Sequence, residues 1–149
     1  MDTVTPEKRS QNMAAIRSKD TKPELFIRKL LFSRGYRYSL YSQKVPGHPD
    51  LYMRKYNTAV FVHGCFWHRH TGCRYCYMPK SRVSYWEKKF QANIDRDISV
   101  RKQLSEKEIK CLVIWECTVK KMKKDLLLRE QVLERICDFL NSEELYDEI

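Results

Sequence analysis

The spacing of apolar residues is helical in the first part of the chain. Thr21 and Glu24 have the spacing of a capping box, in which both side chains bind backbone N–H groups of the first helical turn, and Gly35 is a typical helix stop. The buried face of this predicted helix contains Leu25, Phe26, Ile27, Leu30, Leu31 and Phe32. An earlier helix is predicted over residues 5–17, with few apolar residues, and it could be an arm that orders against a partner.

The spacing becomes extended after residue 35. Residues 36–44 alternate aromatic or apolar side chains with polar ones. Residues 50–56 turn through Asn57 into residues 58–64, which predicts an antiparallel pair of strands. Residues 59–62 are apolar throughout, as expected of a central strand that is buried on both faces.

A helix then separates two apolar strands. Ser84 and Glu87 have capping-box spacing and predict a helix that runs to about residue 104, and residues 109–117 form the next apolar strand. Strand, crossover helix and strand form a βαβ unit, so the two apolar strands should be parallel and adjacent or nearly so. With a last helix over residues 125–140, the pattern predicts an α/β domain with a mixed sheet between helices.

Length and composition fit one compact unit. The chain has 149 residues, of which 42% are hydrophobic and 12% aromatic, enough for one core but not for two full domains. We expect a cytoplasmic protein, because no apolar run approaches the roughly 18–20 residues of a membrane span and the N-terminal residues lack the apolar region of a secretory signal. The cytoplasm keeps thiols reduced, so the six cysteines favour metal ligation or buried thiols over disulfides.

The charge of the chain points to a polyanionic partner. Lys and Arg number 29 against 19 Asp and Glu, a net charge of +10. Residues 138–149 hold five of the carboxylates and no Lys or Arg, so the other 137 residues carry 29 basic against 14 acidic side chains, a net +15. This excess favours nucleic acid as the partner, while charge alone also fits a basic protein that is merely kept soluble.

A dense cluster of Cys and His suggests a zinc site. Cys65, His70, Cys73 and Cys76 are spaced so that they can close around a tetrahedral Zn²⁺. If the two apolar strands are parallel, Cys65 and Cys117 emerge at the same edge of the sheet, so Cys117 is an alternative to Cys76 as the fourth ligand. The pattern leaves this choice open, and it also leaves open that these are reduced Cys and surface His in a loop.

A second constellation suggests hydrolytic chemistry. Asp50 follows Pro49 at the start of a strand, where its carboxylate could bind Mg²⁺, although an ordinary turn Asp is common after Pro. The predicted hairpin would bring Asp50 next to His63 and near His68. A metal-binding carboxylate beside imidazoles, whose ordinary pKa lies near 6.5, is an arrangement for hydrolysis. Glu24 and Asp97 are candidate helpers, although each alone also fits an ordinary helix position.

The third feature is aromatic. Phe66 and Trp67 interrupt the Cys/His cluster, and Trp86 stands near the start of the next helix. Held on a zinc-bound loop among basic residues, these rings could wedge between bases or stack on them. Alternatively, Phe66 and Trp67 cap the core beneath the loop.

Four segments in this order resemble the very-short-patch repair (Vsr) endonucleases, which act on G·T mismatches in DNA. They are HPDLY (48–52), AVFVHGCFWHRHTGC (59–73), SYWEKKFQANIDRD (84–97) and VIWEC (113–117). The resemblance spans roughly residues 7–120. It implies a restriction-endonuclease-like fold, Mg²⁺ as catalytic ion, a structural Zn²⁺, and cleavage of one strand on the 5′ side of the mismatched thymine.

The resemblance also implies roles for individual residues. Asp50 would be the metal carboxylate, with the backbone carbonyl of Val62 as a further metal contact, and His68 the general base. Supporting catalytic residues would be His63, Glu24 and Asp97. Zinc ligands would be Cys65, His70, Cys73 and Cys117. DNA-intercalating residues would be Phe66, Trp67 and Trp86.

Three positions depart from related patterns. Many related nucleases carry a second acidic residue and a Lys on the strand after the first Asp, where this chain has Phe61, Val62 and His63, a trait that the Vsr group shares. Val62 stands where some Vsr members have Thr, which matters little if only the backbone oxygen is used. Cys76 adds a competing zinc ligand.

The sequence therefore predicts a Mg²⁺-dependent endonuclease that nicks DNA at G·T mismatches. We expect an N-terminal helical arm over residues 1–20, an endonuclease domain over 21–137 and an acidic C-terminal tail over 138–149. The expected partners are double-stranded DNA and possible mismatch-repair proteins, and the protein is expected to be a monomer. The alternatives are a restriction-type or structure-specific nuclease with the same site, and a non-catalytic zinc-dependent DNA-binding module.

Overall fold

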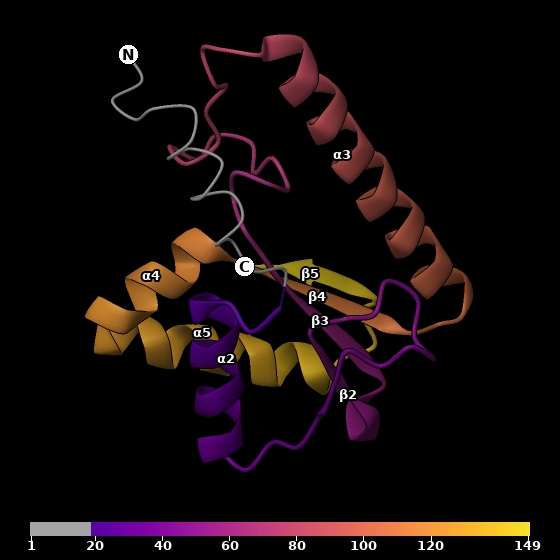
Figure 1. Cartoon of the computed structure of the whole chain (residues 1–149). Coiled ribbons are helices and arrows are strands. Elements are labelled where there is room, and N and C mark those ends of the chain that lie inside the picture. Colours follow the sequence, from indigo (N-terminus) through magenta and orange to yellow (C-terminus); the bar gives the residue numbers. More distant parts are fainter. Residues whose placement is uncertain (1–18) are drawn as a thin grey trace.

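A computed structural model describes residues 19–149, so the helix predicted over 5–17 lies outside the described residues. The described chain is a mixed α/β domain with a five-stranded sheet in the order β1-β2-β3-β4-β5 (Figure 1). Its elements are α2 (Lys22–Ser33), β1 (Ser39–Leu40), β2 (Leu51–Met53), a 3₁₀ turn (Arg54–Tyr56), β3 (Thr58–His63), α3 (Val83–Glu106), β4 (Lys110–Trp115), α4 (Glu116–Lys124), α5 (Leu126–Leu140) and β5 (Tyr146–Glu148). No helix within these residues is long and apolar enough to cross a membrane.

The strand pairing confirms the hairpin and the βαβ unit, although the strand predicted over 50–56 ends at Met53 and residues 54–56 form the 3₁₀ turn. β2 is antiparallel to β3, with Leu51 opposite Val60, and Asn57 makes the turn in a left-handed conformation. β3 is parallel to β4, with Val60 opposite Leu112, and α3 is the crossover helix between them. The carboxyl ends of β3 and β4 therefore meet at one edge of the sheet.

Helices cover both faces of the sheet. On one face α2, α4 and α5 contribute Ile27, Met122 and Ile136 to a core around β2, β3 and β4. On the other face the long helix α3 contributes Leu104 to a second cluster, and it stands apart from the other three helices in Figure 1. Side chains alternate between these faces along each strand, so consecutive residues of β3 serve different cores.

The predicted start of α2 is confirmed, but the prediction that Phe32 belongs to its buried face is wrong. Thr21 Oγ accepts a hydrogen bond from the Glu24 N–H (3.4 Å), and the Glu24 carboxylate accepts one from the N–H of Asp20 (3.0 Å). Phe32 is 52% exposed, because it lies in the last turn on the solvent side, where the Arg37 guanidinium stacks over its ring at 3.9 Å.

Two predicted boundaries after residue 80 are wrong. The Ser84–Glu87 capping box does not form, because α3 begins at Val83, after Arg82 in a left-handed conformation that provides no side-chain cap. The strand predicted to end at 117 ends at Trp115 instead. The chain turns there into α4, a helix absent from the prediction, which buries Val119 and Met122 against the first core.

The acidic C-terminal segment completes the sheet. Residues 146–148 form β5, parallel to β4, with Cys111 opposite Tyr146. Arg135 of α5 binds Asp147 at 2.8 Å. The predicted acidic tail therefore contains the last three residues of α5 and the edge strand β5.

Candidate active site

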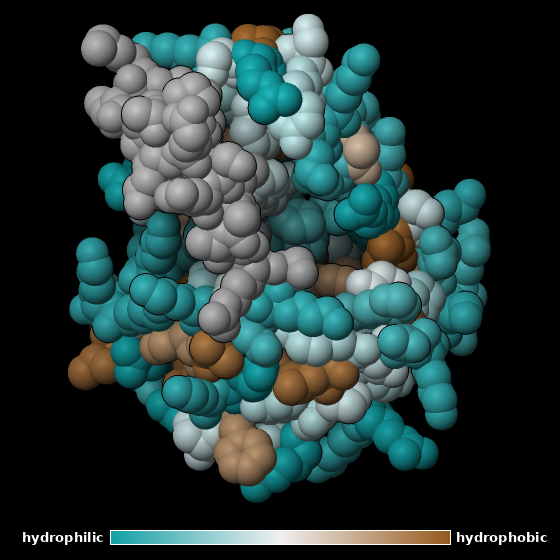
Figure 2. Space-filling model, in the orientation of Figure 1, coloured by the Kyte–Doolittle hydropathy of each residue, from teal (hydrophilic) through white to brown (hydrophobic). Residues whose placement is uncertain are grey.

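A large cleft opens between α2, α3 and the carboxyl end of β3. Its volume is about 1640 Å³, and the residues predicted to carry hydrolytic chemistry line it. Near the centre of Figure 2 the surface is hollowed, and hydrophilic residues line most of this hollow. The predicted catalytic residues that line the cleft are Glu24, Asp50, His63, His68 and Asp97.

A histidine pair and a carboxylate form the first group in the cleft. His63 is the last residue of β3, His68 lies in the loop that follows, and Asp97 projects from α3. Asp97 Oδ2 lies 2.7 Å from His68 Nδ1, and the two imidazole rings stack at 3.8 Å with an interplanar angle of 3°. Because a carboxylate favours the tautomer with Nδ1–H, Nε2 of His68 is its basic nitrogen.

Burial and the adjacent His68 lower the pKa of His63 to about 3. His63 therefore stays neutral at physiological pH and stacks on His68 without adding a positive charge. This arrangement suits a single proton acceptor, His68, that is held in place from both sides.

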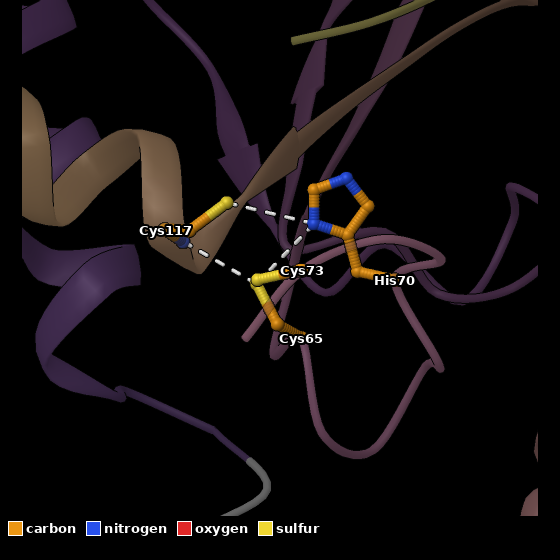
Figure 3. Close-up of side chains that lie close together, drawn as sticks. All are labelled: Cys65, His70, Cys73 and Cys117. Atoms are coloured by element: carbon orange, nitrogen blue, oxygen red, sulfur yellow. Dashed lines mark hydrogen bonds between the residues drawn. The ribbon is translucent and has the colours of Figure 1, made fainter. Parts of the chain in front are cut away.

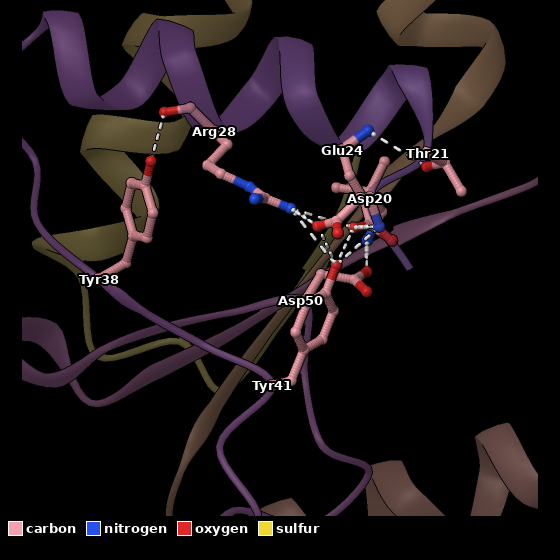
Figure 4. A network of polar contacts seen from close by, with 8 residues as sticks. Asp20, Thr21, Glu24, Arg28, Tyr38, Tyr41 and Asp50 are labelled. Carbon is pink, nitrogen blue, oxygen red and sulfur yellow. Dashed lines mark hydrogen bonds and ion pairs between the residues drawn. The ribbon is translucent and has the colours of Figure 1, made fainter. Parts of the chain in front are cut away.

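A pair of carboxylates forms the second group (Figure 4). Asp50 Oδ2 accepts a hydrogen bond from the backbone N–H of Val62 at 2.7 Å. Burial, followed by the negative charge of Glu24, raises the pKa of Asp50 to about 8. Two carboxylates that share a half-buried site favour either a bound proton or a cation, so this pair can bind a hard metal ion.

Other polar groups hold Glu24 against Asp50. The Tyr41 hydroxyl lies 2.5 Å from Glu24 Oε2, and the Arg28 guanidinium lies 3.5 Å from the same oxygen. Glu24 is buried, so its carboxylate depends on these partners in place of water.

The Cys/His loop (residues 64–82) folds back on the carboxyl ends of β3 and β4. Four ligand atoms, all within 4.8 Å of one another, belong to Cys65, His70, Cys73 and Cys117 (Figure 3). The thiols of Cys65 and Cys117 lie 3.6 and 3.5 Å from His70 Nδ1. Cys76 is not part of this group, because Cys117 in the first turn of α4 takes the fourth place.

This donor set fits a soft divalent metal. Burial raises the pKa of Cys65 to about 12, so without a metal its thiol is protonated and the site is uncharged there. Three thiols and an imidazole are the ligands of many tetrahedral zinc sites, and metal binding would displace the thiol protons. The His70 ring also stacks on Trp115 at 4.1 Å, which fixes its orientation.

The loop aromatics form a cluster of their own, outside both cores. Phe66 lies between 5.0 and 5.4 Å from the rings of Trp67, Tyr77, Trp86 and Phe90. Phe66, Trp67 and Trp86 are half-buried. The Asn93 side-chain amide donates to the Trp67 carbonyl oxygen at 3.0 Å, so α3 holds this cluster beside the cleft.

Comparison with known proteins identifies the family. A family model described as DNA mismatch endonuclease Vsr matches residues 1–74. The type II nicking enzyme V.XorIIP of Xanthomonas oryzae pv. oryzae is 41% identical over 137 residues, which cover 92% of this chain and 97% of the relative. This chain belongs to the Vsr DNA mismatch endonuclease family.

Two further relatives support the assignment of this chain to the Vsr family. The DNA mismatch endonuclease Vsr of Escherichia coli is 35% identical over 134 residues, covering 87% of this chain and 83% of the relative. The type II nicking enzyme V.NmeAIP of Neisseria meningitidis is 43% identical over 119 residues, covering 80% and 84%. The chain is therefore a DNA endonuclease, and the resemblance found in the sequence is confirmed.

The Vsr-family site differs in one respect from the predicted constellation. The sequence placed Asp50 next to His63, and in the structure Asp50 accepts a hydrogen bond from the N–H of Val62, the residue before His63. The Asp50 carboxylate meets Glu24, however, while the His63 ring stacks on His68. Side-chain alternation explains this, because Val62 packs into the first core while His63 faces Trp115 on the side of α3. The carboxylates and the histidines are thus two groups on one cleft.

Some residues of the Vsr-family site had no role in the sequence prediction. Arg28 follows Glu24 by four residues, a spacing that places the two side chains together on a helix and could have revealed the pair. Tyr41 and Asn93 carry no such signal, since their contacts join elements far apart in the sequence.

Proposed function

We propose that this endonuclease nicks one strand of duplex DNA on the 5′ side of the thymine in a G·T mismatch. The observation that carries the proposal is the pair of polar groups on one cleft: a carboxylate pair at Asp50 and a histidine held by Asp97. Membership of the Vsr family supports the mismatch as substrate, and one such cleft in one small domain suits the cleavage of a single strand.

The proposed catalytic ion is Mg²⁺. Asp50 and Glu24 offer the oxygen ligands that Mg²⁺ prefers, and the backbone carbonyl of Val62 is a further candidate contact. When bound, the ion would supply positive charge for the scissile phosphate and its developing oxyanion. The Val62 N–H would keep the Asp50 carboxylate aimed at the same place, since it holds one carboxylate oxygen.

His68 is the proposed general base. Its Nε2 would take a proton from the attacking water while Asp97 keeps Nδ1 protonated and stabilises the imidazolium that forms. His63 would fix the plane of the His68 ring by stacking and, because it is neutral, would not repel the new charge. The attacking water oxygen would bond to the phosphorus while the scissile phosphorus–oxygen bond breaks, and the leaving oxygen would take a proton from solvent.

The proposed role of zinc is structural. Cys65, His70, Cys73 and Cys117 come from the loop after β3 and from α4, so a shared Zn²⁺ would fasten the loop to the sheet. His68 lies within this loop. Zinc would therefore hold the proposed base against Asp97, as well as the aromatic cluster beside it.

The aromatic cluster is the proposed source of mismatch selectivity. A G·T wobble pair stacks less well than a matched pair, so unstacking it costs less of the few kcal/mol that intercalation requires. Phe66, Trp67 and Trp86 are half-buried against one another, and this packing would hold the rings rigidly while they wedge into the duplex. Selectivity would thus come partly from the deformability of the mismatch.

The proposal also covers the fold type, the domain organisation, the oligomeric state, the location and the partners of the protein. The mixed sheet with α2 and α3 on its two faces fits a restriction-endonuclease-like arrangement. Residues 1–20 would be a DNA-contacting arm and residues 21–137 the endonuclease domain, whose last helix and sheet the acidic residues 138–149 complete. We propose a monomer that acts in the cytoplasm, with mismatch-repair proteins as further partners.

Cleavage assays on three substrates test the proposal. A duplex with one G·T pair, the matched duplex and a branched DNA are compared at equal salt, because electrostatic affinity depends on ionic strength. Preferential Mg²⁺-dependent nicking of the G·T duplex supports the proposal. Equal cleavage of matched or branched DNA would instead indicate a restriction-type or structure-specific nuclease, and zinc-dependent binding without cleavage a binding module.

A further inference from the structure

A second, smaller groove lies on the other side of the Cys/His loop, between this loop and α4. Its volume is about 630 Å³. Four cationic side chains line it: Arg74, Lys120, Lys121 and Lys124. All four are exposed, and none has a role in the proposed reaction.

The positive charge of this groove is concentrated, and no ion pair among the described residues neutralises it. Residues 64–86 contain four Lys or Arg and no Asp or Glu. Residues 117–124 contain four Lys, with Glu116 and Asp125 at the two ends of this run. Among the ion pairs of residues 19–149, none includes the four cations of the groove. A Zn²⁺ held by three thiolates and a neutral imidazole would carry a net −1, which leaves most of this charge in place.

Tyr75 draws two of these cations together. The Lys120 ammonium lies 4.0 Å from the centre of the Tyr75 ring, and the Arg74 guanidinium lies 4.9 Å from it. Arg74 also donates a hydrogen bond to the Tyr75 hydroxyl at 2.8 Å. Because like charges repel, a site that collects them without a carboxylate is suited to an anion with several charges.

The small groove adjoins the active-site cleft. His70 and Thr71 line both, so a polymer that leaves the cleft over the zinc ligands would reach the groove directly. The buried side of α4 packs on the first core through Val119 and Met122, which fixes the helix and turns its lysines outward. The groove is therefore a firm surface that continues the cleft.

We propose that this groove is a second DNA-contact surface, which binds sugar-phosphate backbone outside the segment held in the cleft. The proposal rests on the proposed function only in requiring that the cleft holds duplex DNA; it does not require a mismatch. Phosphate contacts of this kind carry no sequence information, so the groove would add affinity and orientation without changing which base pair is recognised.

The test is the salt dependence of DNA binding by a triple variant, Lys120→Gln, Lys121→Gln and Lys124→Gln. Each phosphate contact on B-DNA contributes roughly 0.9 to the slope of log K against log salt, so the variant should lose about 2 to 3 from the slope. The loss is expected with both matched and G·T duplexes that extend well beyond the cleft. Shortening the duplex to the cleft segment should make wild type and variant alike.

Matched variants separate this proposal from other effects. Lys29→Gln, Lys102→Gln and Lys107→Gln remove three exposed lysines that line neither the cleft nor the groove, and they should leave the slope nearly unchanged. Replacing Lys120, Lys121 and Lys124 by Arg instead should restore the slope. Circular dichroism and zinc content show whether each variant is folded.

Two results would overturn the proposal: an unchanged slope in the folded α4 variant, or an equal loss in the control variant. Both readouts are independent of cleavage. Failure of the proposed mismatch nicking would appear instead in the substrate comparison described above, with the slope difference still present.

Discussion

Asp97 on α3 holds His68 of the Cys/His loop through a 2.7 Å contact between Asp97 Oδ2 and His68 Nδ1. The His63 ring stacks on the His68 ring, with 3.8 Å between the ring centres. The contact joins a helix to a loop that has no regular structure around residue 68. The position of the proposed base therefore depends on one carboxylate from another element.

Asp97→Asn should slow nicking without weakening DNA binding. The amide keeps the size of the side chain but no longer stabilises a positively charged His68, so the single-turnover rate should fall by roughly 100-fold or more. Rapid-quench cleavage of a saturated G·T duplex measures the rate, and a binding titration provides the control. An unchanged rate would remove His68 and Asp97 from the proposed proton transfer.

Asp50→Asn should abolish Mg²⁺-dependent nicking and yet stabilise the metal-free protein at alkaline pH. The pKa of Asp50 is raised from 3.8 to about 8 by burial and by Glu24, so the folded state holds a proton that the unfolded state has lost between these values. The contribution of Asp50 to stability therefore falls as pH rises from about 4 to 8. Because asparagine does not titrate, the variant should lack this contribution to the fall in folding stability with rising pH.

Thermal unfolding at pH 5 and pH 9, with and without Mg²⁺, measures this effect. Mg²⁺ should raise the Tm of the wild-type protein more at pH 9 than at pH 5, whereas it should raise the Tm of Asp50→Asn little at either pH. Cleavage by Asp50→Asn at the wild-type rate, or equal stabilisation of both proteins by Mg²⁺, would contradict the assignment of the metal carboxylate.

Cys117→Ser and Cys76→Ser form a matched pair for the zinc site. Cys117 belongs to the four-ligand group and Cys76 does not, so the first change should lose bound zinc and the second should keep one atom per chain. Cys117→Ser should also lose at least about 3 kcal/mol of folding stability. For a chain of this size, such a loss lowers the Tm by roughly 6–12 °C. Elemental analysis and thermal unfolding check both variants; zinc loss from Cys76→Ser alone would reverse the assignment.

Trp67→Ala should reduce the preference for mismatched DNA. Stacking of an aromatic side chain on a base contributes roughly 1–3 kcal/mol, or about 5- to 150-fold in affinity, and the loss should be larger for the G·T duplex than for the matched one. Phe32→Ala, which removes an exposed ring on α2, is the control. Equal weakening on both duplexes would show that Trp67 adds affinity without selectivity.

The centre of the sheet was predictable from the sequence because its strands are marked by continuous apolar runs, whereas β5 lies in the segment predicted as an acidic tail. Residues 59–62 and 109–117 predicted the parallel pair, and this pair in turn made Cys117 a candidate ligand beside Cys65. α4 was missed because its four lysines hide the helical spacing of its only two buried residues, Val119 and Met122. Local sequence shows a helix poorly when tertiary packing provides most of its stability.

The carboxylate pair was harder to predict than the zinc ligands. Glu24 begins α2 and Asp50 begins β2, and their contact depends on how α2 packs across the sheet. The hairpin register correctly brought Asp50 to Val62, and strand alternation places Val62 and His63 on opposite sides, but neither shows which carboxylate α2 brings to Asp50. Three-dimensional packing, rather than any motif, therefore decides which carboxylate lies with which partner.

Strand-resolved mapping of cuts in a duplex with a single G·T pair tests the central claim most directly. Each strand is labelled separately, Mg²⁺ is added, and the products are sized at nucleotide resolution, with Asp50→Asn as the inactive control. The account predicts one cut, in the thymine strand, immediately 5′ of the mismatched T. Cuts in both strands, or cuts unrelated to the mismatch, would contradict it.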